Sequence, residues 1–211
     1  MISKKSVVDA LSEGMKQRGF SAQKKNDRFF KRMNFGCFYY QFAFLSKAGW
    51  LFVVPAACVR FDRVESIYHQ TSGTPAEMQA DTFTIGIDFD RHFNDQTLRF
   101  VAKEEADLTH LVPSLLWAFD TYAEPFYSEF GSIIAADTAL NDRPSEPCPY
   151  RPMPWLRAAS GLIIAKLANR EDFQALANIY QEQMASFSNG FYKGRFNHLL
   201  DILSNTGSLK D

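Results

Sequence analysis

With 211 residues, of which 46% are hydrophobic and 22% charged, the chain is long enough to bury a large core without a metal ion or a disulfide. No segment approaches the ~20 consecutive apolar residues of a transmembrane helix. The start of the chain lacks the apolar core of a secretion signal, so we expect a cytoplasmic protein without a membrane partner. The three cysteines show neither metal-site nor disulfide spacing, and the sequence indicates no cofactor.

Charge is distributed unevenly along the chain. Residues 1–47 hold ten basic and three acidic residues, whereas the remainder holds thirteen and twenty-one, and the formal net charge is −1. Such an asymmetry can steer a charged partner towards the protein. It can equally be neutralised when basic and acidic segments fold against each other, which is the interpretation we favour.

Aromatic residues are unusually abundant, at 15% of the chain with twenty phenylalanines. Aromatic side chains bury large areas in protein cores and are also enriched at interfaces between proteins. A phenylalanine-packed core is the first interpretation of this surplus. An exposed aromatic contact surface is the second.

The first helix is predicted from about Lys4 to Arg18. Ser3 is a suitable N-cap, because its hydroxyl can accept a hydrogen bond from an unpaired backbone amide. Gly19 can adopt the left-handed conformation that ends many helices. The apolar residues recur at spacings of three and four and form one stripe: Val7, Val8, Leu11 and Met15.

Two aromatic strands are predicted next, at Arg28–Met33 and Cys37–Leu45, joined by a turn at Asn34-Phe35-Gly36. An aromatic face on such a strand is typical of a sheet that helices cover on one side. Because successive side chains of a strand point to opposite faces, four rings of the second strand share one face: Phe38, Tyr40, Phe42 and Phe44.

A third strand is predicted at Trp50–Val54. Because Pro55 disfavours an uninterrupted central strand, we expect a bulge, a sheet edge or the end of the strand there. A short helix or irregular segment follows, and then a loop at 71–75. The clearest strand pattern covers residues 82–89. Its inward-facing residues are Phe83, Ile85, Ile87 and Phe89.

From about Lys103 the apolar periodicity becomes helical. Pro113 should kink or delay this helix, and Pro125 should separate it from another helix at 126–140. The apolar stripe consists of Leu108, Leu111, Val112, Leu115, Leu116 and Phe119. Five prolines between Asn141 and Pro154 mark the best candidate for a linker, and three more helices are predicted after it: 155–168, 171–187 and 191–203.

These elements predict an α+β fold with an N-terminal helix, a four- to five-stranded antiparallel sheet covered by helices, and a helical C-terminal extension. The proline-rich segment predicts an α+β domain at residues 1–142 and a helical extension at 150–211 that packs on it, or one domain overall.

The order of helix, aromatic strand pair, strand and helix resembles the uncharacterised bacterial domain-of-unknown-function family numbered 4304, over roughly residues 4–140. The resemblance implies an α+β fold and little about activity, because its motifs are packing and turn patterns. It rests on Arg18-Gly19-Phe20, Phe29-Phe30, Tyr39-Tyr40-Gln41-Phe42, Thr82–Ile87 and Phe119–Phe126.

One polar cluster is suited to a metal ion. Asp88, Asp90 and His92 follow the clearest strand, and carboxylates with a histidine are suitable ligands for a divalent cation. A metal-dependent nuclease or phosphoesterase could use such a site. The alternative is a simple turn, since Asp and Asn favour turns, and Arg91 within the cluster would repel a cation.

A second cluster interleaves basic residues with Phe29 and Phe30, and this pattern can bind single-stranded nucleic acid. Strand alternation divides the cluster between both faces of the strand, so we do not expect a sorted binding platform. The basic residues are Lys24, Lys25, Arg28, Lys31 and Arg32.

No motif of nucleophilic catalysis or phosphate binding is present. Cys37 or Cys58 could pair with a distant histidine as a thiol nucleophile, but both lie in apolar runs where inert cysteines are common. We therefore expect no catalytic residue. The four histidines, His69, His92, His110 and His198, are expected in structural or surface positions.

The leading functional hypothesis is a non-enzymatic protein-binding module, with a toxin-neutralising immunity protein as one form of it. That form rests on analogy with small bacterial proteins of this general kind. The metal-dependent hydrolase is the alternative, and a nucleic-acid-binding protein is the second alternative. The sequence leaves the partner and the oligomeric state open.

Overall fold

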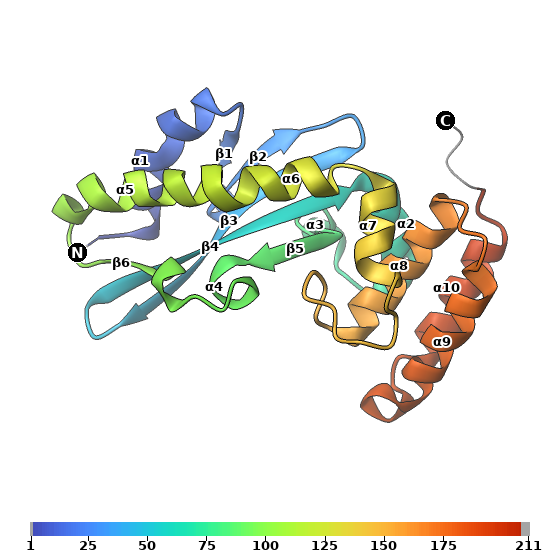
Figure 1. Ribbon diagram of the computed structural model, residues 1–211. Coiled ribbons are helices and arrows are strands. Elements are labelled where there is room, and N and C mark those ends of the chain that lie inside the picture. The colour runs from blue at the N-terminus through green and yellow to red at the C-terminus, as the bar shows by residue number, and fades with distance from the viewer. Residues whose placement is uncertain (1, 208–211) are drawn as a thin grey trace. The chain divides into compact units, whose positions relative to one another are not determined.

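The computed structural model describes residues 2–207, except for the side chain of Lys24 (Figure 1). The chain is α+β, as predicted, and divides into two compact units. Unit 1 combines Met1–Val59 with Gly86–Glu129, and unit 2 combines Arg60–Ile85 with Phe130–Asp211. This division differs from the expected one, because the proline-rich segment lies inside unit 2. No helix of the described residues is long and apolar enough to cross a bilayer.

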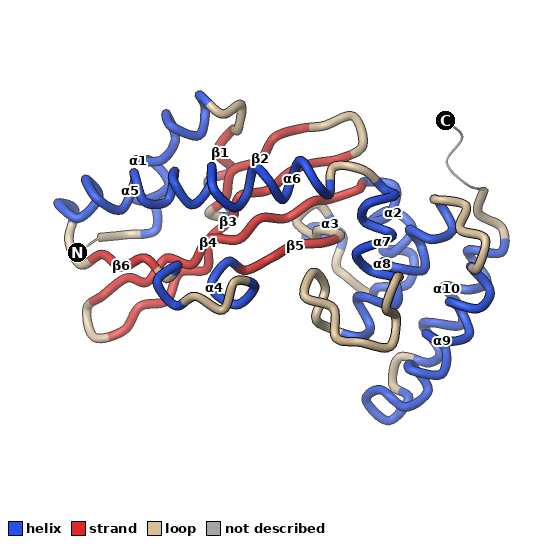
Figure 2. Tube along the Cα trace, in the orientation of Figure 1, coloured by secondary structure: helices blue, strands red, loops and turns tan. Residues whose placement is uncertain are grey.

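Unit 1 is built on an antiparallel sheet, drawn in red in Figure 2. The strand order is β1-β2-β3-β4-β5, and β6 pairs with β4 beside β5. The end of β4 and the start of β5 lead into unit 2. The strands are β1 (Ser21–Gln23), β2 (Arg28–Arg32), β3 (Gly36–Lys47), β4 (Trp50–Phe61), β5 (Ile85–Asp88) and β6 (Phe100–Ala102).

Helices cover one face of this sheet, as the aromatic alternation predicts (Figure 1). The helices of unit 1 are α1 (Lys4–Gln17), α4 (Phe89–His92), α5 (Leu108–Ala118), the π-helical turn η4 (Phe119–Ala123) and α6 (Glu124–Phe130). The Tyr40 hydroxyl donates to the Leu115 carbonyl of α5 at 2.8 Å. The Phe38 ring stacks on Tyr127 of α6, with centroids 4.6 Å apart. Phe38 and Tyr40 of the aromatic face of β3 therefore lie in the core of unit 1, whereas Phe42 and Phe44 are half-buried.

The first helix agrees closely with its prediction. The Ser3 hydroxyl accepts from the Ser6 amide at 3.0 Å, which satisfies one of the free donors at the helix start. Gly19 has a φ of 80° just after the helix, where a glycine is preferred. The predicted apolar stripe is fully buried: Val7, Val8, Leu11 and Met15.

Prolines disturb unit 1 less than predicted. β4 continues through Pro55 to Phe61. Its pairing with β6 ends at Val53, so the backbone N–H that Pro55 lacks is not needed for the hydrogen bonds between β4 and β6. Pro113 lies inside α5, and Pro125 lies inside α6 without separating it from α5. The π-helical turn η4 directly precedes Pro125, and its wider hydrogen-bonding pattern accommodates a residue that cannot donate.

The regular elements of unit 2 are helices, apart from the last residues of β4 and the first residue of β5. The predicted strand at 82–89 is shorter than expected, because only Ile85–Asp88 is extended and Phe89 begins α4. The three C-terminal helices agree with their predicted positions. The helices of unit 2 are α2 (Asp62–Ser72), α3 (Ala76–Gln79), α7 (Ile133–Asn141), α8 (Pro154–Leu167), α9 (Phe173–Ser186), η5 (Phe187–Gly190) and α10 (Lys193–Ser204).

Candidate functional site

The three residues predicted as metal ligands make other contacts. Asp88 at the end of β5 is exposed and lies 3.5 Å from Arg91. Asp90 is buried in α4, and its Oδ2 accepts from Arg99 Nε at 2.6 Å. His92 is half-buried, and burial lowers its pKa. The described residues contain no group of three or more His, Cys, Asp or Glu side chains that could hold a metal ion. The geometry therefore gives the metal hypothesis no support.

The predicted basic surface is dispersed. The Lys24 side chain lies outside the described residues, and Lys25 and Arg32 are exposed. Arg28 is buried, with its guanidinium 4.0 Å from the centroid of the Tyr39 ring. Arg28 and Arg32 share one face of β2, whereas Lys31 lies on the other face, above the Phe20 ring. The two faces of β2 therefore divide Arg28 and Arg32 from Lys31, in agreement with the strand alternation.

The charge asymmetry of the sequence is neutralised within the units. Unit 1 contains thirteen basic and twelve acidic residues, and unit 2 contains ten and twelve. Arg18 of the basic N-terminal segment forms two hydrogen bonds of 2.6 Å with Asp120. The Ser6 hydroxyl donates to Glu105 at 2.7 Å. The asymmetry therefore no longer argues for a steering surface.

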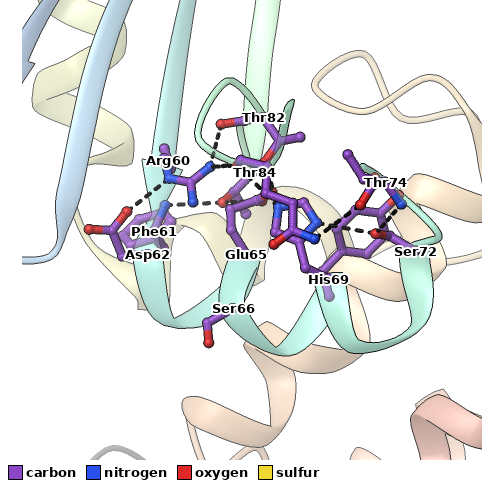
Figure 3. Close-up of polar contacts among 12 residues, drawn as sticks. Arg60, Phe61, Asp62, Glu65, Ser66, His69, Ser72, Thr74, Thr82 and Thr84 are labelled. Carbon is purple, nitrogen blue, oxygen red and sulfur yellow. Dashed lines mark hydrogen bonds and ion pairs between the residues drawn. The ribbon is translucent and has the colours of Figure 1, made fainter. Parts of the chain in front are cut away.

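Unit 2 contains a buried polar cluster that the sequence analysis missed (Figure 3). We call Arg60, Glu65, His69, Thr82 and Thr84 the Glu65 cluster. Glu65 has no exposed surface, and its two oxygens accept from Thr82 Oγ1 at 2.6 Å and Thr84 Oγ1 at 2.9 Å. Arg60 Nη1 donates to the carbonyl of Thr82 at 2.8 Å. The cluster therefore joins helix α2 to the segment that leads into β5.

The hydrogen bonds of the Glu65 cluster define the protonation of His69. Nε2 lies 3.2 Å from the Gln79 carbonyl and 3.0 Å from Thr82 Oγ1, and that hydroxyl has acceptors of its own in Glu65 and the Gln79 carbonyl. Since the carbonyl can only accept, Nε2 carries a proton. Nδ1 lies 3.1 Å from the Ser72 hydroxyl and can accept from it. A neutral ring with its proton on Nε2 fits these contacts, and burial lowers the pKa of His69.

A glutamate and a histidine four residues apart on one helix could act as an acid and a base. Here, however, Glu65 is fully buried, the His69 side chain is only 7% exposed, and both are hydrogen-bonded to protein groups. A substrate has no access to their reacting atoms. The Glu65 cluster is therefore built to hold a loop in place. The helical spacing of Glu65 and His69 was the only signal for it in the sequence.

Several aromatic rings of unit 1 contact one another at the protein surface. Trp117 is 50% exposed on α5, and its ring contacts Tyr122 edge-on at 5.6 Å. Tyr122 also contacts the exposed ring of Phe93, with centroids 4.5 Å apart. Exposed aromatic rings in mutual contact are typical of surfaces that bind other proteins.

This exposed region extends along α5 towards β4 and β6. His110, Ser114 and Trp117 recur at helical spacing and share one side of α5. His110 and Ser114 line a shallow cavity of about 170 Å³ together with Trp50 and Val101, both of which are exposed. We call five side chains of this region the aromatic strip: the exposed Trp50, Phe93, Val101 and Trp117, and the half-buried Tyr122.

Comparison with known proteins adds no family: no family model, curated protein or solved structure matches this chain. The resemblance drawn from the sequence therefore stays a prediction.

Proposed function

We propose that this chain is a non-enzymatic protein-binding module and that its partner binds the aromatic strip. The observation that carries the proposal is the exposure of two tryptophans of unit 1: Trp50, which lines a cavity with His110 and Ser114 of α5, and Trp117, one helical turn beyond Ser114. Tryptophan is large and apolar, so burying it against a partner releases more water-exposed area than burying most other side chains. Residues of this type contribute most of the binding energy in many protein interfaces.

The surroundings of the strip support the same proposal. The Lys103 ammonium lies 5.6 Å from the centroid of the Trp50 ring, and Asp107 and His110 line the neighbouring cavity. Apolar rings at the centre with charged and polar groups around them match the usual organisation of protein interfaces. The exposed positions contrast with the predicted alternative site at Asp90, where the carboxylate is buried and paired with Arg99.

The test is affinity capture followed by measured binding. The purified chain should retain one stoichiometric partner from its native source, and that partner should bind the Trp117→Ala variant at least about thirty-fold more weakly, as expected for a central interface residue worth about 2 kcal/mol. Phe191→Ala is the matched control, because Phe191 is an aromatic residue of unit 2 that is 67% exposed. Equal binding by wild type and the Trp117 variant would exclude this surface, and recovery of no partner would count against the module itself.

Toxin neutralisation is the narrower form of the proposal, and its support is analogy alone. It predicts that the captured partner arrests growth when it is expressed alone. Co-expression of the wild-type chain should restore growth, whereas the Trp50→Ala/Trp117→Ala variant should not. A partner that is harmless on its own would remove the immunity role and leave the binding function standing.

A further inference from the structure

The strand β3 has an open edge over half of its length. It covers Gly36–Lys47, but β2 pairs only with its residues Cys37–Gln41. Beyond Gln41, β3 pairs with β4 on one side, and no described strand pairs with it on the other. Figure 2 shows the hairpin of β3 and β4 continuing past the end of β2. We call Phe42–Lys47 the free edge, and its length is about 20 Å.

The register of the sheet shows which backbone groups point to this open side. Met33 and Gly36 exchange both of their backbone hydrogen bonds, at 2.9 and 3.3 Å. In an antiparallel sheet every second residue bonds to the same neighbouring strand, so every second residue after Gly36 directs its N–H and C=O towards the β2 side. On the free edge these residues are Phe42, Phe44 and Ser46. The backbone bonds that the described residues form outside helices and strands do not involve them either.

The free edge lacks the usual protection against pairing with another chain. The outer strands of the sheet, β1, β5 and β6, have only 3, 4 and 3 residues, and such short edges pair poorly. The free edge is longer, contains no proline, and has Lys47 as its only charged residue. The Leu45 side chain is 56% exposed, and Phe42 and Phe44 are half-buried. A long apolar edge of this kind is a template for a further strand.

We propose that the free edge binds an extended segment of a partner protein, which joins the sheet as a further strand beside β3. An extended backbone carries donors and acceptors at the spacing of the open groups of Phe42, Phe44 and Ser46, so the main chain of the segment supplies their hydrogen bonds. Apolar side chains at alternate positions of the segment cover the two half-buried rings. The inference goes beyond the proposed function, because no residue of the aromatic strip belongs to the free edge.

A second copy of this chain fits the free edge less well than a segment of another protein. If two copies of β3 paired antiparallel about Phe44, Lys47 of the second copy would lie opposite Gln41 of the first. Arg28 of β2 already holds that place. Moving the centre of the pair towards the end of β3 removes this conflict, but it leaves fewer residues to pair. The open backbone groups are therefore matched best by a strand that ends where β2 begins.

Amide hydrogen exchange, followed by NMR for each residue of the purified chain, tests whether the edge is open. The protection factors of the Phe44 and Ser46 amides should be about tenfold or more below those of Ala43 and Leu45, which point to β4. Equal protection of the two sets would show that the edge is already covered, and the proposal would be overturned.

A library of random peptides of about eight residues, displayed on phage, supplies probes for the strand itself. Peptides enriched on the purified chain are synthesised, and their affinities are measured by fluorescence anisotropy. Ser46→Pro removes one outward N–H without removing a bond to β4, and it should weaken binding about tenfold or more. Ser46→Ala keeps that N–H and is the matched control, with an affinity within about twofold of wild type.

The bound peptide should also raise the protection factor of the wild-type Phe44 amide, a measurement that does not depend on the folding of a variant. Peptides that bind Ser46→Pro as tightly as wild type but bind Trp117→Ala weakly would place the site on the aromatic strip. A dimer of the free chain that Ser46→Pro dissociates would make a second copy the occupant. Either result, or a library from which no peptide is enriched, would overturn the proposal.

Discussion

The two units keep polar groups out of their interiors to very different degrees. Of the eleven buried polar or charged residues among the described part of the chain, nine lie in unit 2, and only Arg28 and Asp90 lie in unit 1. The core of unit 1 is apolar and contains rings in contact, such as Phe20 with Phe119 and Tyr40 with Phe119, among many aliphatic side chains. The units have nearly the same length, so size does not explain the difference.

The difference follows from how the backbone hydrogen-bonding groups of each unit are satisfied. In unit 1 the hydrogen bonds of the sheet satisfy most of the backbone, so the side chains between sheet and helices can be apolar. Unit 2 contains an irregular segment at 142–153 and irregular stretches on either side of the short helix α3, at 73–75 and 80–84, and their backbone groups need side-chain partners. Arg60 and Arg157 donate to backbone carbonyls of these segments, and Glu65 accepts from the hydroxyls of Thr82 and Thr84. Unit 2 should therefore depend on buried polar groups, whereas unit 1 should depend on packing.

The largest expected effect is in the Glu65 cluster. Glu65→Ala removes the acceptor of the Thr84 hydroxyl and the nearer of the two acceptors of the Thr82 hydroxyl. The free energy of unfolding should therefore fall by about 3 kcal/mol, as is typical when one partner of a buried polar set is removed. Urea denaturation followed by circular dichroism measures it. Ser66→Ala, at an exposed position of the same helix, is the control and should change stability by less than about 0.5 kcal/mol. A loss as small as that of the control would show that the cluster is not what holds this loop.

Alanine substitutions of one helical glycine in each unit test how rigid the two interiors are. A Cβ at Gly161 of α8 would lie 2.5 Å from Asn141 Oδ1, and this amide is fixed because its nitrogen donates to Asp137 at 2.6 Å. Gly161→Ala should therefore cost about 2 kcal/mol. A Cβ at Gly14 of α1 would lie 2.7 Å from the end of the Leu116 side chain, which can move. The helix preference of alanine, about 1 kcal/mol over glycine, should offset most of the cost there.

Thermal denaturation of the two glycine variants measures the difference. The midpoint for Gly161→Ala should fall by several degrees, as a loss of about 2 kcal/mol implies for a chain of this size, while Gly14→Ala stays close to wild type. Equal losses in both variants would mean that the polar interior of unit 2 is no more rigid than the apolar interior of unit 1.

Two tyrosine hydroxyls provide a smaller version of the same comparison. In unit 2 the Tyr180 hydroxyl donates to Asn141 Oδ1 at 2.8 Å, and Tyr180→Phe leaves that buried oxygen without this donor. The expected loss is about 2 kcal/mol. In unit 1 the Tyr40 hydroxyl donates to the Leu115 carbonyl, which already accepts a backbone bond within its helix. Tyr40→Phe should cost about 1 kcal/mol or less by urea denaturation. A reversed order would contradict the contrast between the units.

The sequence predicted most of the elements whose form is decided locally. The apolar stripe of α1, the aromatic face of β3 and the three C-terminal helices all follow from periodicity, and the structure has them. The continuation of β4 through Pro55 and the shortened strand at Ile85–Asp88 did not follow from it. In the second case tertiary contacts decide, because Glu65 binds the side chains of Thr82 and Thr84.

The sites were less predictable than the fold. Asp88, Asp90 and His92 drew attention because they are adjacent in sequence, yet Asp90 pairs with Arg99. In the Glu65 cluster, Thr82 and Thr84 lie 17 and 19 positions after Glu65 in the sequence. No local sequence pattern predicts contacts over such a separation. The exposure of Trp117 could have been inferred, since Trp117 lies outside the apolar stripe that ends in Phe119. The two side chains are 50% and 0% exposed.

The smallest expected effect is a pH dependence of stability, and it again compares the units. Burial lowers the pKa of His69 in unit 2 and of His92 in unit 1 below the ordinary value of 6.5. The unfolded chain therefore binds more protons than the folded chain as the pH falls below that value, so stability is complete above it and declines on acidification. The decline ends below the folded-state pKa values, where both states are protonated.

His69 should contribute more of this decline than His92, because protonation of Nδ1 reverses its hydrogen bond with Ser72, whose hydroxyl oxygen already accepts from the Thr74 amide. Urea midpoints of the wild type should fall between about pH 7.5 and pH 5.5, a range that includes the ordinary histidine pKa. His69→Gln should flatten this dependence more than His92→Gln, and His110→Gln at an exposed position serves as the control. If His92→Gln flattens the pH dependence of the urea midpoint most, the acid-sensitive group lies in unit 1. The buried polar groups of unit 2 would then not be the source of the loss of stability in acid.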